Sequence, residues 1–444
     1  MKIIIVGAGE VGKHLAKLLA YEHVETTLMD EDPVRMEDIG ENYDLLIQKG
    51  NPSSIKDLKE INAGKADLFV AVTPYESVNI TACMLAKNLG AKDTLARIDN
   101  YEYLQPENKL FFEQSGVNHL IYPEMLAGKE IAESLKTSWI RQYHSFCSGA
   151  LILVACKVRA GAAIINKKFK TGYFNHDKYR IVSIKRKMDT IIPKGADEIK
   201  ENDLVYFITM PENLDFVREE AGKEDYEINN VIFMGGSRIV KEAIYQMPEH
   251  ISKKIMEWDK EKCYQLADKF ADTLIINADA RDIEKLKEEG IQDTHAFVAA
   301  TSNTESNILA CLAAKRFGIR KSIAEVENID YIMLAESLDI GTVFNKKFIA
   351  ASYIYQITLN ADVLNAHNLI YVDAEAVEFI VKEKSKITRS KIKDIRLPEQ
   401  VNIGGLVRDG KGFIVNGETQ IQAGDAVVVF CPAAKIRKLE SFFT

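Results

Sequence analysis

Residues 3–12 read Ile3-Ile4-Ile5-Val6-Gly7-Ala8-Gly9-Glu10-Val11-Gly12, a short apolar run followed by glycines in the pattern G-x-G-x-x-G. The apolar run predicts a buried strand, and the glycines predict a tight turn into a helix. In such a unit the first glycine allows the turn, the second lets the backbone approach a pyrophosphate, and the third lets the helix pack closely on the strand. The N–H groups of Gly9–Gly12 then face a diphosphate at the helix start. This stretch predicts a dinucleotide-binding site.

The first 135 residues alternate short apolar runs with helical patterns. This alternation indicates the α/β class and a parallel, doubly wound Rossmann-like sheet with ligands at the carboxyl ends of its strands. The predicted strands are Lys2–Val6, Glu25–Met29, Asp44–Gln48, Asp67–Thr73, Thr94–Ile98 and His119–Ile121. Helix starts are predicted at Asp32-Pro33, Asn51-Pro52 and Thr73-Pro74, with Glu76 completing a capping box with Thr73.

The chain carries this unit twice. Thr73 and Asn79 recur at a constant offset as Thr301 and Asn307, and Phe69-Val70-Ala71 recurs as Phe297-Val298-Ala299. Residues 141–222 read instead as short strands with little helix, and their stretch Asn202–Phe207 is echoed by Gly424–Phe430. We therefore expect two Rossmann-like domains, residues 1–140 and 229–362. Each is followed by a small α+β domain, residues 141–225 and 363–444.

Candidate ligand contacts lie at the ends of the predicted strands. Asp30 ends the second strand, where a carboxylate accepts hydrogen bonds from ribose hydroxyls and repels a 2′-phosphate, so NAD(H) is favoured over NADP(H). Arg97 ends the fifth strand, where a guanidinium suits phosphate oxygens. The predicted cofactor-binding residues are Gly7, Ala8, Gly9, Glu10, Val11, Gly12, Asp30, Asn51, Thr73, Pro74 and Arg97.

Three of these residues also have a purely structural interpretation. Asp30 lies in Met29-Asp30-Glu31-Asp32-Pro33, where it could serve only as a turn acid. Arg97 could form an exposed ion pair with Asp93 or Asp99, an interaction that usually contributes little. Thr73 could cap its helix without touching a ligand. The sequence leaves these alternatives open.

The second copy departs from the first where a nucleotide would bind. Ser237 replaces Gly9, Val240 replaces Gly12, and Glu325 replaces Arg97, whereas Glu257 keeps the place of Asp30. A valine at the third glycine should push the helix away from the strand, and a glutamate opposes phosphate. We expect the second site to be empty, weak or altered in ligand, with Glu257 as its candidate contact.

Composition narrows the classes of function. Lys and Arg number 57 against 65 Asp and Glu, which gives a net charge of −8. No concentrated basic stretch is present, so we expect no nucleic-acid partner. The six cysteines form no C-x-x-C pair and read as core thiols of a reducing cytosol. No secretory signal and no membrane-spanning run is found, so we expect a cytoplasmic protein.

Chemistry beyond nucleotide binding is not indicated. The eight histidines, among them His14, His119 and His295, show no metal-ligand spacing. No nucleophile elbow or pair of general base and orienting residue is recognisable. The sequence therefore predicts no catalytic residues, no metal site and no enzyme.

The glycine turn, Asp30, Ala71-Val72-Thr73, Ala96-Arg97-Ile98 and the paired small domains together resemble the RCK family, the regulators of potassium conductance. The order of four domains over the whole chain is similar to that of the peripheral subunit of Trk potassium-uptake systems. The resemblance implies a ring, expected to be a homotetramer, on the inner face of the plasma membrane. It also implies NAD+ or NADH as the ligand, with ATP and ADP as further ligands, and gating of a TrkH- or TrkG-like membrane subunit.

Two alternatives remain. The first is an NAD-dependent dehydrogenase whose small domains supply substrate groups; the small domains offer no recognisable acid–base pair for it. The second is an RCK-type regulator of a different cation transporter.

Overall fold

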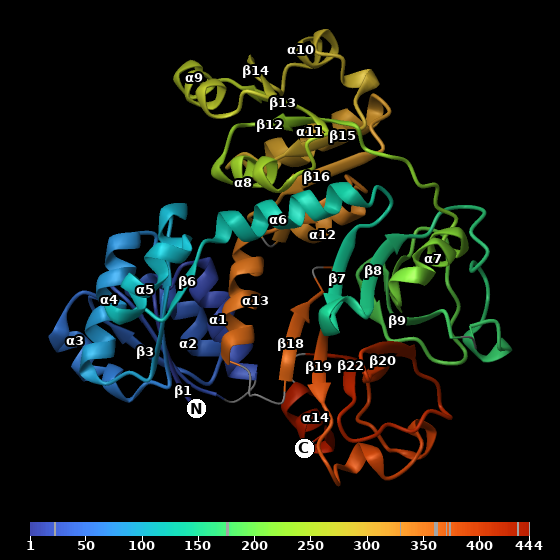
Figure 1. Cartoon of the computed structure of the whole chain (residues 1–444), viewed down its shortest axis with the longest axis horizontal. Coiled ribbons are helices and arrows are strands. Elements are labelled where there is room, and N and C mark those ends of the chain that lie inside the picture. Colours follow the sequence, from blue (N-terminus) through green and yellow to red (C-terminus); the bar gives the residue numbers. More distant parts are fainter. Residues whose placement is uncertain are drawn as a thin grey trace. The chain divides into compact units, whose positions relative to one another are not determined.

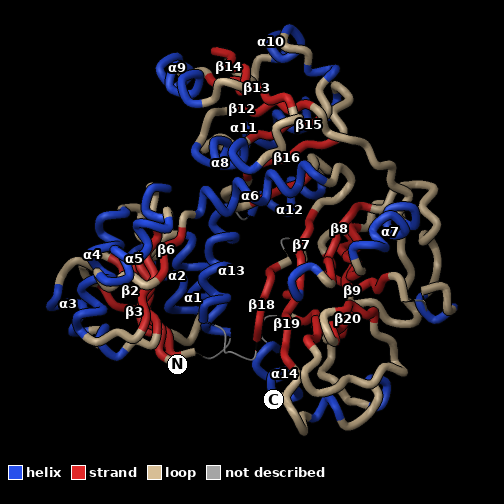
Figure 2. Tube along the Cα trace, in the orientation of Figure 1, coloured by secondary structure: helices blue, strands red, loops and turns tan. Residues whose placement is uncertain are grey.

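The structure, a computed structural model, describes residues 1–21, 24–174, 177–328, 330–358, 363–369, 371–372, 374–432 and 435–443. Its contacts divide the chain into two compact units (Figures 1 and 2). The first comprises Met1–Leu126 with Lys346–Leu359, and the second comprises Ala127–Asn345 with Asn360–Thr444.

The first unit is built on a six-stranded parallel sheet of order β3-β2-β1-β4-β5-β6. Its strands are β1 (Lys2–Val6), β2 (Glu25–Asp30), β3 (Leu46–Lys49), β4 (Leu68–Ala71), β5 (Asp93–Arg97) and β6 (His119–Ile121). Its helices are α1 (Glu10–Tyr21), α2 (Glu37–Asn42), α3 (Ile55–Glu60), α4 (Glu76–Leu89), α5 (Pro106–Gln114) and α13 (Lys346–Thr358). Ile3 to Val6 are fully buried, as the apolar run predicts. The doubly wound parallel sheet is confirmed, and every predicted strand is present.

Two of the three predicted helix starts are wrong. Asp32 does cap the 3₁₀ helix Pro33–Met36, accepting the N–H of Val34. However, α3 is capped by Ser54, and the Asn51 side chain accepts the N–H of Ser53 in a local turn. Helix α4 begins after Tyr75, because Thr73 Oγ1 accepts the N–H of Tyr75 and holds the loop in a turn. The capping box of Thr73 with Glu76 is therefore absent.

The second unit contains a parallel sheet of the same topology, with order β14-β13-β12-β15-β16-β17. Its strands are β12 (Asn230–Met234), β13 (Ser252–Glu257), β14 (Thr273–Asn277), β15 (Ala296–Ala299), β16 (Lys321–Glu325) and β17 (Thr342–Phe344). Its helices are α8 (Arg238–Gln246), α9 (Lys260–Lys269), α10 (Ile283–Glu288), α11 (Thr304–Arg316) and α12 (Asp330–Ser337). The duplication predicted from the sequence therefore extends to the strand order.

Two antiparallel sheets complete the second unit, and they too share one topology. The first, β10-β9-β11-β8-β7, comprises β7 (Gln142–Phe146), β8 (Leu151–Lys157), β9 (Tyr179–Arg186), β10 (Asp189–Ile191) and β11 (Leu204–Thr209), followed by α7 (Leu214–Glu220). The second, β18-β19-β22-β20-β21, comprises β18 (Val363–Asn368), β19 (Glu375–Ile380), β20 (Asn402–Arg408), β21 (Lys411–Ile414) and β22 (Ala426–Cys431), followed by α14 (Ile436–Phe443).

The same ion pair, between a buried aspartate and a partly exposed arginine, occurs in both antiparallel sheets. Arg186 donates to both carboxylate oxygens of Asp203, at 2.9 and 2.7 Å. Arg408 donates to both carboxylate oxygens of Asp425, each at 2.7 Å. Because bidentate pairs of this kind fix both side chains, they mark equivalent positions in the two copies.

The helices that follow the two parallel sheets pack away from their own sheets. Helix α13 follows β17 in sequence but packs on α1, where the rings of Phe348 and His14 lie 4.2 Å apart. Residues 127–136 of α6 (Pro123–Lys136) belong to the second unit. There a Cβ added to Gly128 would lie 2.7 Å from the backbone nitrogen of Ala243 in α8. The glycine permits this close helix contact.

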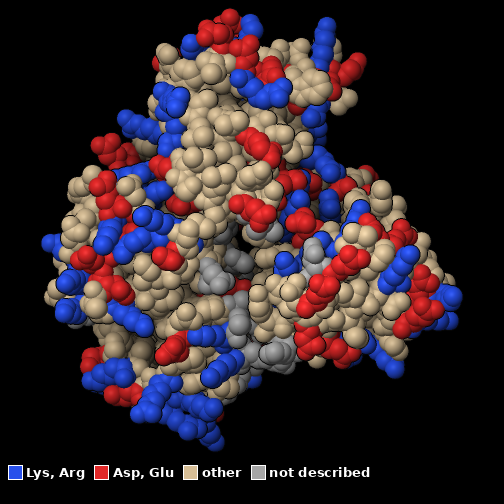
Figure 3. All heavy atoms as spheres, turned by 180° about the vertical axis from the view of Figure 1, so that it is seen from behind, with Lys and Arg blue, Asp and Glu red and all other residues tan. Residues whose placement is uncertain are grey.

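In the parts of the chain that the structure describes, no helix is both long enough and apolar enough to cross a bilayer. Basic and acidic side chains are mixed over most of the face shown in Figure 3.

Candidate functional site

The glycine turn after β1 is tightly packed at its two ends. Gly7 has φ +104°, and a Cβ on it would lie 2.8 Å from the backbone nitrogen of Thr73. A Cβ on Gly12 would lie 2.0 Å from the carbonyl oxygen of Gly7. Both contacts are shorter than atoms tolerate, so the fold itself requires these two glycines.

Gly9 differs from the other two glycines. A Cβ on Gly9 would meet no atom within 4 Å, and no positive φ requires a glycine there. Its carbonyl accepts the N–H of Lys13 and begins α1, while the neighbouring Ala8 and Val11 are buried and Glu10 is exposed. Packing within the chain therefore gives no reason for a glycine at position 9.

The other predicted site residues end neighbouring parallel strands. Gly7 follows β1, Asp30 ends β2, Asn51 follows β3, Thr73 and Pro74 follow β4, and Arg97 ends β5. Since the strands are parallel, these residues lie along one edge of the sheet. Strand β1 lies between β2 and β4, so this edge contains the switch point where doubly wound sheets bind ligands.

Asp30 fastens the glycine turn to β2. Its carboxylate accepts the N–H of Ala8 at 2.6 Å and the N–H of Asp32 at 2.9 Å, and the side chain is buried. Each carboxylate oxygen still has a second lone pair for a ribose hydroxyl. Asp30 thus has a structural role beside the predicted one, and replacing it would alter the turn as well as any ligand contact.

Asn79 joins the ends of β4 and β5. Its Nδ2 donates to the carbonyls of Thr73 and Arg97, at 3.0 and 2.9 Å, and its Oδ1 accepts the N–H of Thr73. Asn307 makes the same bonds to Thr301 and Glu325 in the second copy. Since the network survives where the glycines are lost, it supports the strand ends and is not specific to a ligand.

Arg97 has unused hydrogen-bonding capacity. Its Nε is buried without a hydrogen-bond partner among the described residues, and its Nη2 contacts Asp99 at a long 3.3 Å. The Asp99 loop is itself held by Glu76, which accepts the N–H groups of Asp99 and Asn100 at 2.6 and 2.8 Å. This role of Glu76 is not visible along the chain, because its partners lie on a loop distant in sequence. An unmet buried donor costs about 1–3 kcal/mol, so a phosphate oxygen within reach of Arg97 would be favoured.

In the second copy, the acid beside the equivalent turn is already paired with a basic side chain of the protein. Glu257 accepts the N–H groups of Gly236 and Asp259, as Asp30 does for Ala8 and Asp32, but it also binds Lys262 Nζ at 3.2 Å. Burial raises the pKa of Glu257, and these N–H and ammonium donors more than offset that effect, leaving the pKa below its ordinary value. Glu257 therefore keeps the place of Asp30 but is already paired with a cation.

The residues that replace Gly9, Gly12 and Arg97 in the second copy are Ser237, Val240 and Glu325, and each lies at the helix start or in the protein interior. The Ser237 hydroxyl accepts the N–H of Val240 at 3.4 Å and caps α8. The Val240 side chain is fully buried, and Glu325 is 2% exposed. Ser237 therefore stabilises the helix start and Val240 packs in the core, where the first copy has glycines, and Glu325 places a buried carboxylate where the first copy has an arginine.

Models of two known domain families match most of the chain. The TrkA-N domain model matches residues 3–123 and again 231–346, and the TrkA-C domain model matches residues 153–222 and 376–444. The four matches follow one another in the order found in the structure.

Full-length relatives exist in several organisms. The Trk system potassium uptake protein TrkA of Haemophilus influenzae is 31% identical, over 100% of this chain and 98% of the relative. The protein of the same name from Vibrio alginolyticus is 30% identical over 100% and 98%. A TrkA homolog of Methanosarcina mazei is 30% identical over the whole of both chains.

Solved structures share the fold at low identity. The GsuK RCK domain has a TM-score of 0.60 and 13% identity, covering 100% of this chain and 94% of the other. The GsuK channel bound to NAD has a TM-score of 0.59 and 13% identity, covering 100% of this chain and 78% of the other.

Proposed function

Because the chain belongs to the TrkA family of potassium-uptake proteins, we propose that it is the regulatory subunit of a Trk-type potassium-uptake system. In this proposal the first parallel sheet binds NAD(H) at the glycine turn, with ATP and ADP as further ligands. Binding changes the conformation of the subunit and thereby gates a membrane potassium-translocating protein. The protein itself performs no chemistry on the nucleotide.

The observation that carries this proposal is the contrast between the glycines. Gly7 and Gly12 are required by contacts within the chain, whereas Gly9 faces open space. A position kept free of a side chain without an internal reason indicates close approach by a ligand, and in this turn the ligand group is a diphosphate. Asp30 would accept the ribose hydroxyls and Arg97 would bind phosphate oxygens.

The second parallel sheet is proposed to support assembly rather than sensing. Lys262 already neutralises Glu257, and Ser237 occupies the place of Gly9. The finer parts of the proposal concern partners. We propose a ring, specifically a homotetramer, that attaches to a TrkH- or TrkG-like subunit at the inner face of the plasma membrane.

Replacing Gly9 by serine tests the site directly. Serine is a preferred residue before a helix, and a Cβ here meets no protein atom, so thermal stability should be kept or slightly raised. The same Cβ would stand in the path of the diphosphate, so NAD(H) affinity should fall at least tenfold by titration calorimetry. Ser237→Gly in the second copy is the matched control and should leave the affinity unchanged. Equal affinity of wild type and Gly9→Ser would disprove this site.

Potassium uptake tests the function. Deleting the protein from its host should impair uptake at low external potassium, and the wild-type chain should restore it. When the Gly9→Ser variant is produced in the deletion strain, it should again associate with the membrane fraction. Potassium uptake in that strain should no longer respond to the NADH/NAD+ ratio. Unaltered uptake in a deletion strain without a second copy would remove the proposed function. Turnover of NADH with a carbonyl substrate would instead support a dehydrogenase.

A further inference from the structure

A basic surface segment lies between β19 and β20 of the second unit. Residues 382–396 carry seven basic side chains against two acids, Glu383 and Asp394. All seven are exposed: Lys382, Lys384, Lys386, Arg389, Lys391, Lys393 and Arg396. Basic side chains also gather at the lower left of Figure 3, over the domain that contains the second antiparallel sheet. The expectation that the chain has no concentrated basic stretch is therefore wrong for this segment.

Only part of this positive charge is compensated by acids of the protein. Lys391 and Lys393 both pair with Glu418, at 2.9 and 2.6 Å. The basic residues that form no ion pair with any described residue are Lys384, Lys386, Arg389 and Arg396. Like charges this close in sequence repel one another, so the fold gains nothing from gathering them.

The protein holds the segment in a fixed shape. It contains two short 3₁₀ turns, Lys386–Thr388 and Ile392–Asp394, and the Ile387 side chain of the first turn is fully buried. The N–H of Lys393 donates to the carbonyl of Gly417 at 3.0 Å. A partner that binds here therefore meets a preformed surface and has little backbone to order.

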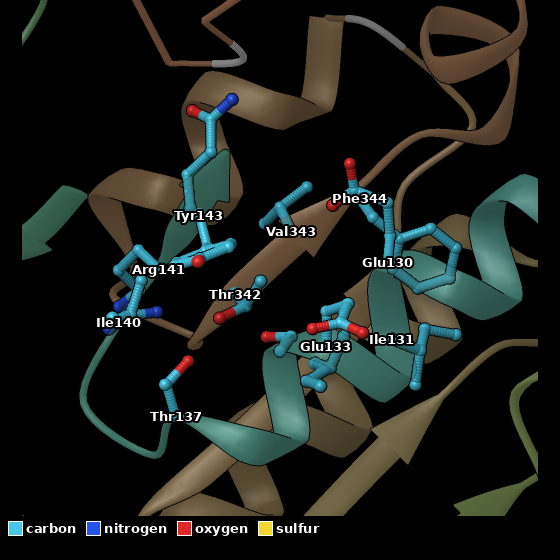
Figure 4. Close-up of a pocket in the computed structure, with 13 residues that line it drawn as sticks. Glu130, Ile131, Glu133, Thr137, Ile140, Arg141, Tyr143, Thr342, Val343 and Phe344 are labelled. Atoms are coloured by element: carbon cyan, nitrogen blue, oxygen red, sulfur yellow. The ribbon is translucent and has the colours of Figure 1, made fainter. Parts of the chain in front are cut away.

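Other basic side chains of the second unit are engaged inside the protein. Arg141 lines the pocket drawn in Figure 4 and donates to Asp339 at 2.8 Å. Lys321 is buried, and its amino group donates to the carbonyls of Thr137 and Ile140 at 3.4 and 2.6 Å. These two side chains serve the fold, whereas the basic side chains of residues 382–396 face solvent.

The chemistry of the segment selects among anionic partners. Residues 382–396 form no α-helix that could enter a nucleic-acid groove, and they include no aromatic residue on which a base could stack. An anionic lipid surface requires neither feature. Clusters of about four to eight Lys and Arg bind its phosphate head groups by charge.

We propose that residues 382–396 bind the anionic head groups of a membrane surface, through Lys384, Lys386, Arg389 and Arg396. The contact is electrostatic and stays outside the acyl chains. It rests on the proposed function only for the place of the protein beside a membrane, and it requires neither the potassium-translocating subunit nor NAD(H). It keeps the protein at the membrane whether or not nucleotide is bound.

Co-sedimentation of the purified full-length protein with vesicles tests the proposal. The protein should sediment with vesicles of phosphatidylglycerol and phosphatidylcholine in equal parts, but not with phosphatidylcholine alone. Binding should weaken about tenfold between about 50 and about 300 mM KCl, because salt screens surface charge. Each basic side chain near an anionic leaflet contributes about fivefold in affinity. The double variant Arg389→Gln with Arg396→Gln should therefore bind about 25-fold more weakly.

Two further double variants are the controls. Arg389→Lys with Arg396→Lys keeps the charge and should bind the mixed vesicles as the wild type does. Lys285→Gln with Lys287→Gln removes the same charge from α10, where both lysines pair with glutamates, and should also bind as the wild type does. Thermal unfolding and NAD(H) affinity should be unchanged in all three double variants, which shows that each is folded.

Three results would overturn the proposal. The first is equal sedimentation of the wild type and the glutamine variant of Arg389 and Arg396. The second is equal sedimentation with mixed vesicles and with phosphatidylcholine alone. The third is binding of duplex DNA or of an acidic peptide without binding of vesicles, which would assign the segment to a nucleic-acid or protein partner. Since these experiments contain no potassium-translocating subunit, their failure would leave the proposed function intact.

Discussion

Gly12→Val is expected to abolish NAD(H) binding by the first lobe and to destabilise its parallel sheet. A Cβ at this position would lie 2.0 Å from the Gly7 carbonyl oxygen and 3.4 Å from the Ile5 side chain, both in the segment that α1 covers. The helix start must therefore move away from the turn, and its N–H groups move with it. Overpacking of this kind costs about 3 kcal/mol, and the displaced N–H groups no longer face a diphosphate.

Two measurements check this result. Titration calorimetry should show no NAD(H) binding, and hydrogen exchange should show reduced protection in β1 and α1 while β12 and α8 keep theirs. The control is Val240→Gly, which gives the second copy the glycine of the first. That variant should leave NAD(H) affinity unchanged. Wild-type affinity in Gly12→Val would contradict the role given to the glycine turn.

Asp339→Asn is expected to weaken the second unit by about 2 kcal/mol, because it removes one partner from a partly buried ion-pair network in which the Asp339 side chain is 23% exposed. Asp339 follows α12 and carries φ +56°. Its carboxylate lies 2.8 Å from Arg141, 3.5 Å from Lys157, 2.5 Å from Arg159 and 2.9 Å from Lys315. Three of these cations belong to the first antiparallel sheet or its flanks. Asparagine tolerates the same backbone conformation, so the substitution removes the charge and little else.

The stabilising effect of Asp339 should depend on pH in a definite direction. Burial would raise the pKa of Asp339, but Arg141, Lys315 and Arg159 hold it well below its ordinary value. A carboxyl group whose pKa is lower in the folded than in the unfolded state stabilises the folded protein at every pH above its unfolded-state pKa. That stabilisation is lost as the pH falls through the folded-state pKa. The stability difference between wild type and Asp339→Asn should thus be constant at neutral pH and vanish only in strong acid.

Hydrogen exchange of β7, β8 and α12 at neutral pH is the measurement for Asp339→Asn, because the chain has several domains and need not unfold in one step. Glu418→Gln is the matched control. Glu418 also accepts from two lysines, but on the surface, and exposed pairs contribute little. Equal protection in the Asp339 variant and wild type would show that the cations around Asp339 find other partners.

Much of the candidate site could be predicted because its signals are local. The G-x-G-x-x-G turn, the acid at the end of β2 and the repeat of Asn79 as Asn307 are read along the chain. The predicted helix starts at Asn51 and Thr73 failed for a local reason as well: both side chains form turns of their own, which compete with capping. Two pairings could not be predicted without the structure: Glu257 with Lys262, and Glu76 with the N–H groups of the Asp99 loop.

The sequence by itself determined the two parallel sheets, the duplication and the position of the glycine turn. Hydrophobic periodicity and glycine spacing act over a few residues, so they are visible without coordinates. Only the tertiary structure decided that α13 packs on α1 and α6 on α8, that Asp339 lies within 4 Å of four cationic side chains, and that Gly9, unlike Gly7 and Gly12, faces open space. These features depend on contacts between residues far apart in the chain, whose partners no local pattern specifies.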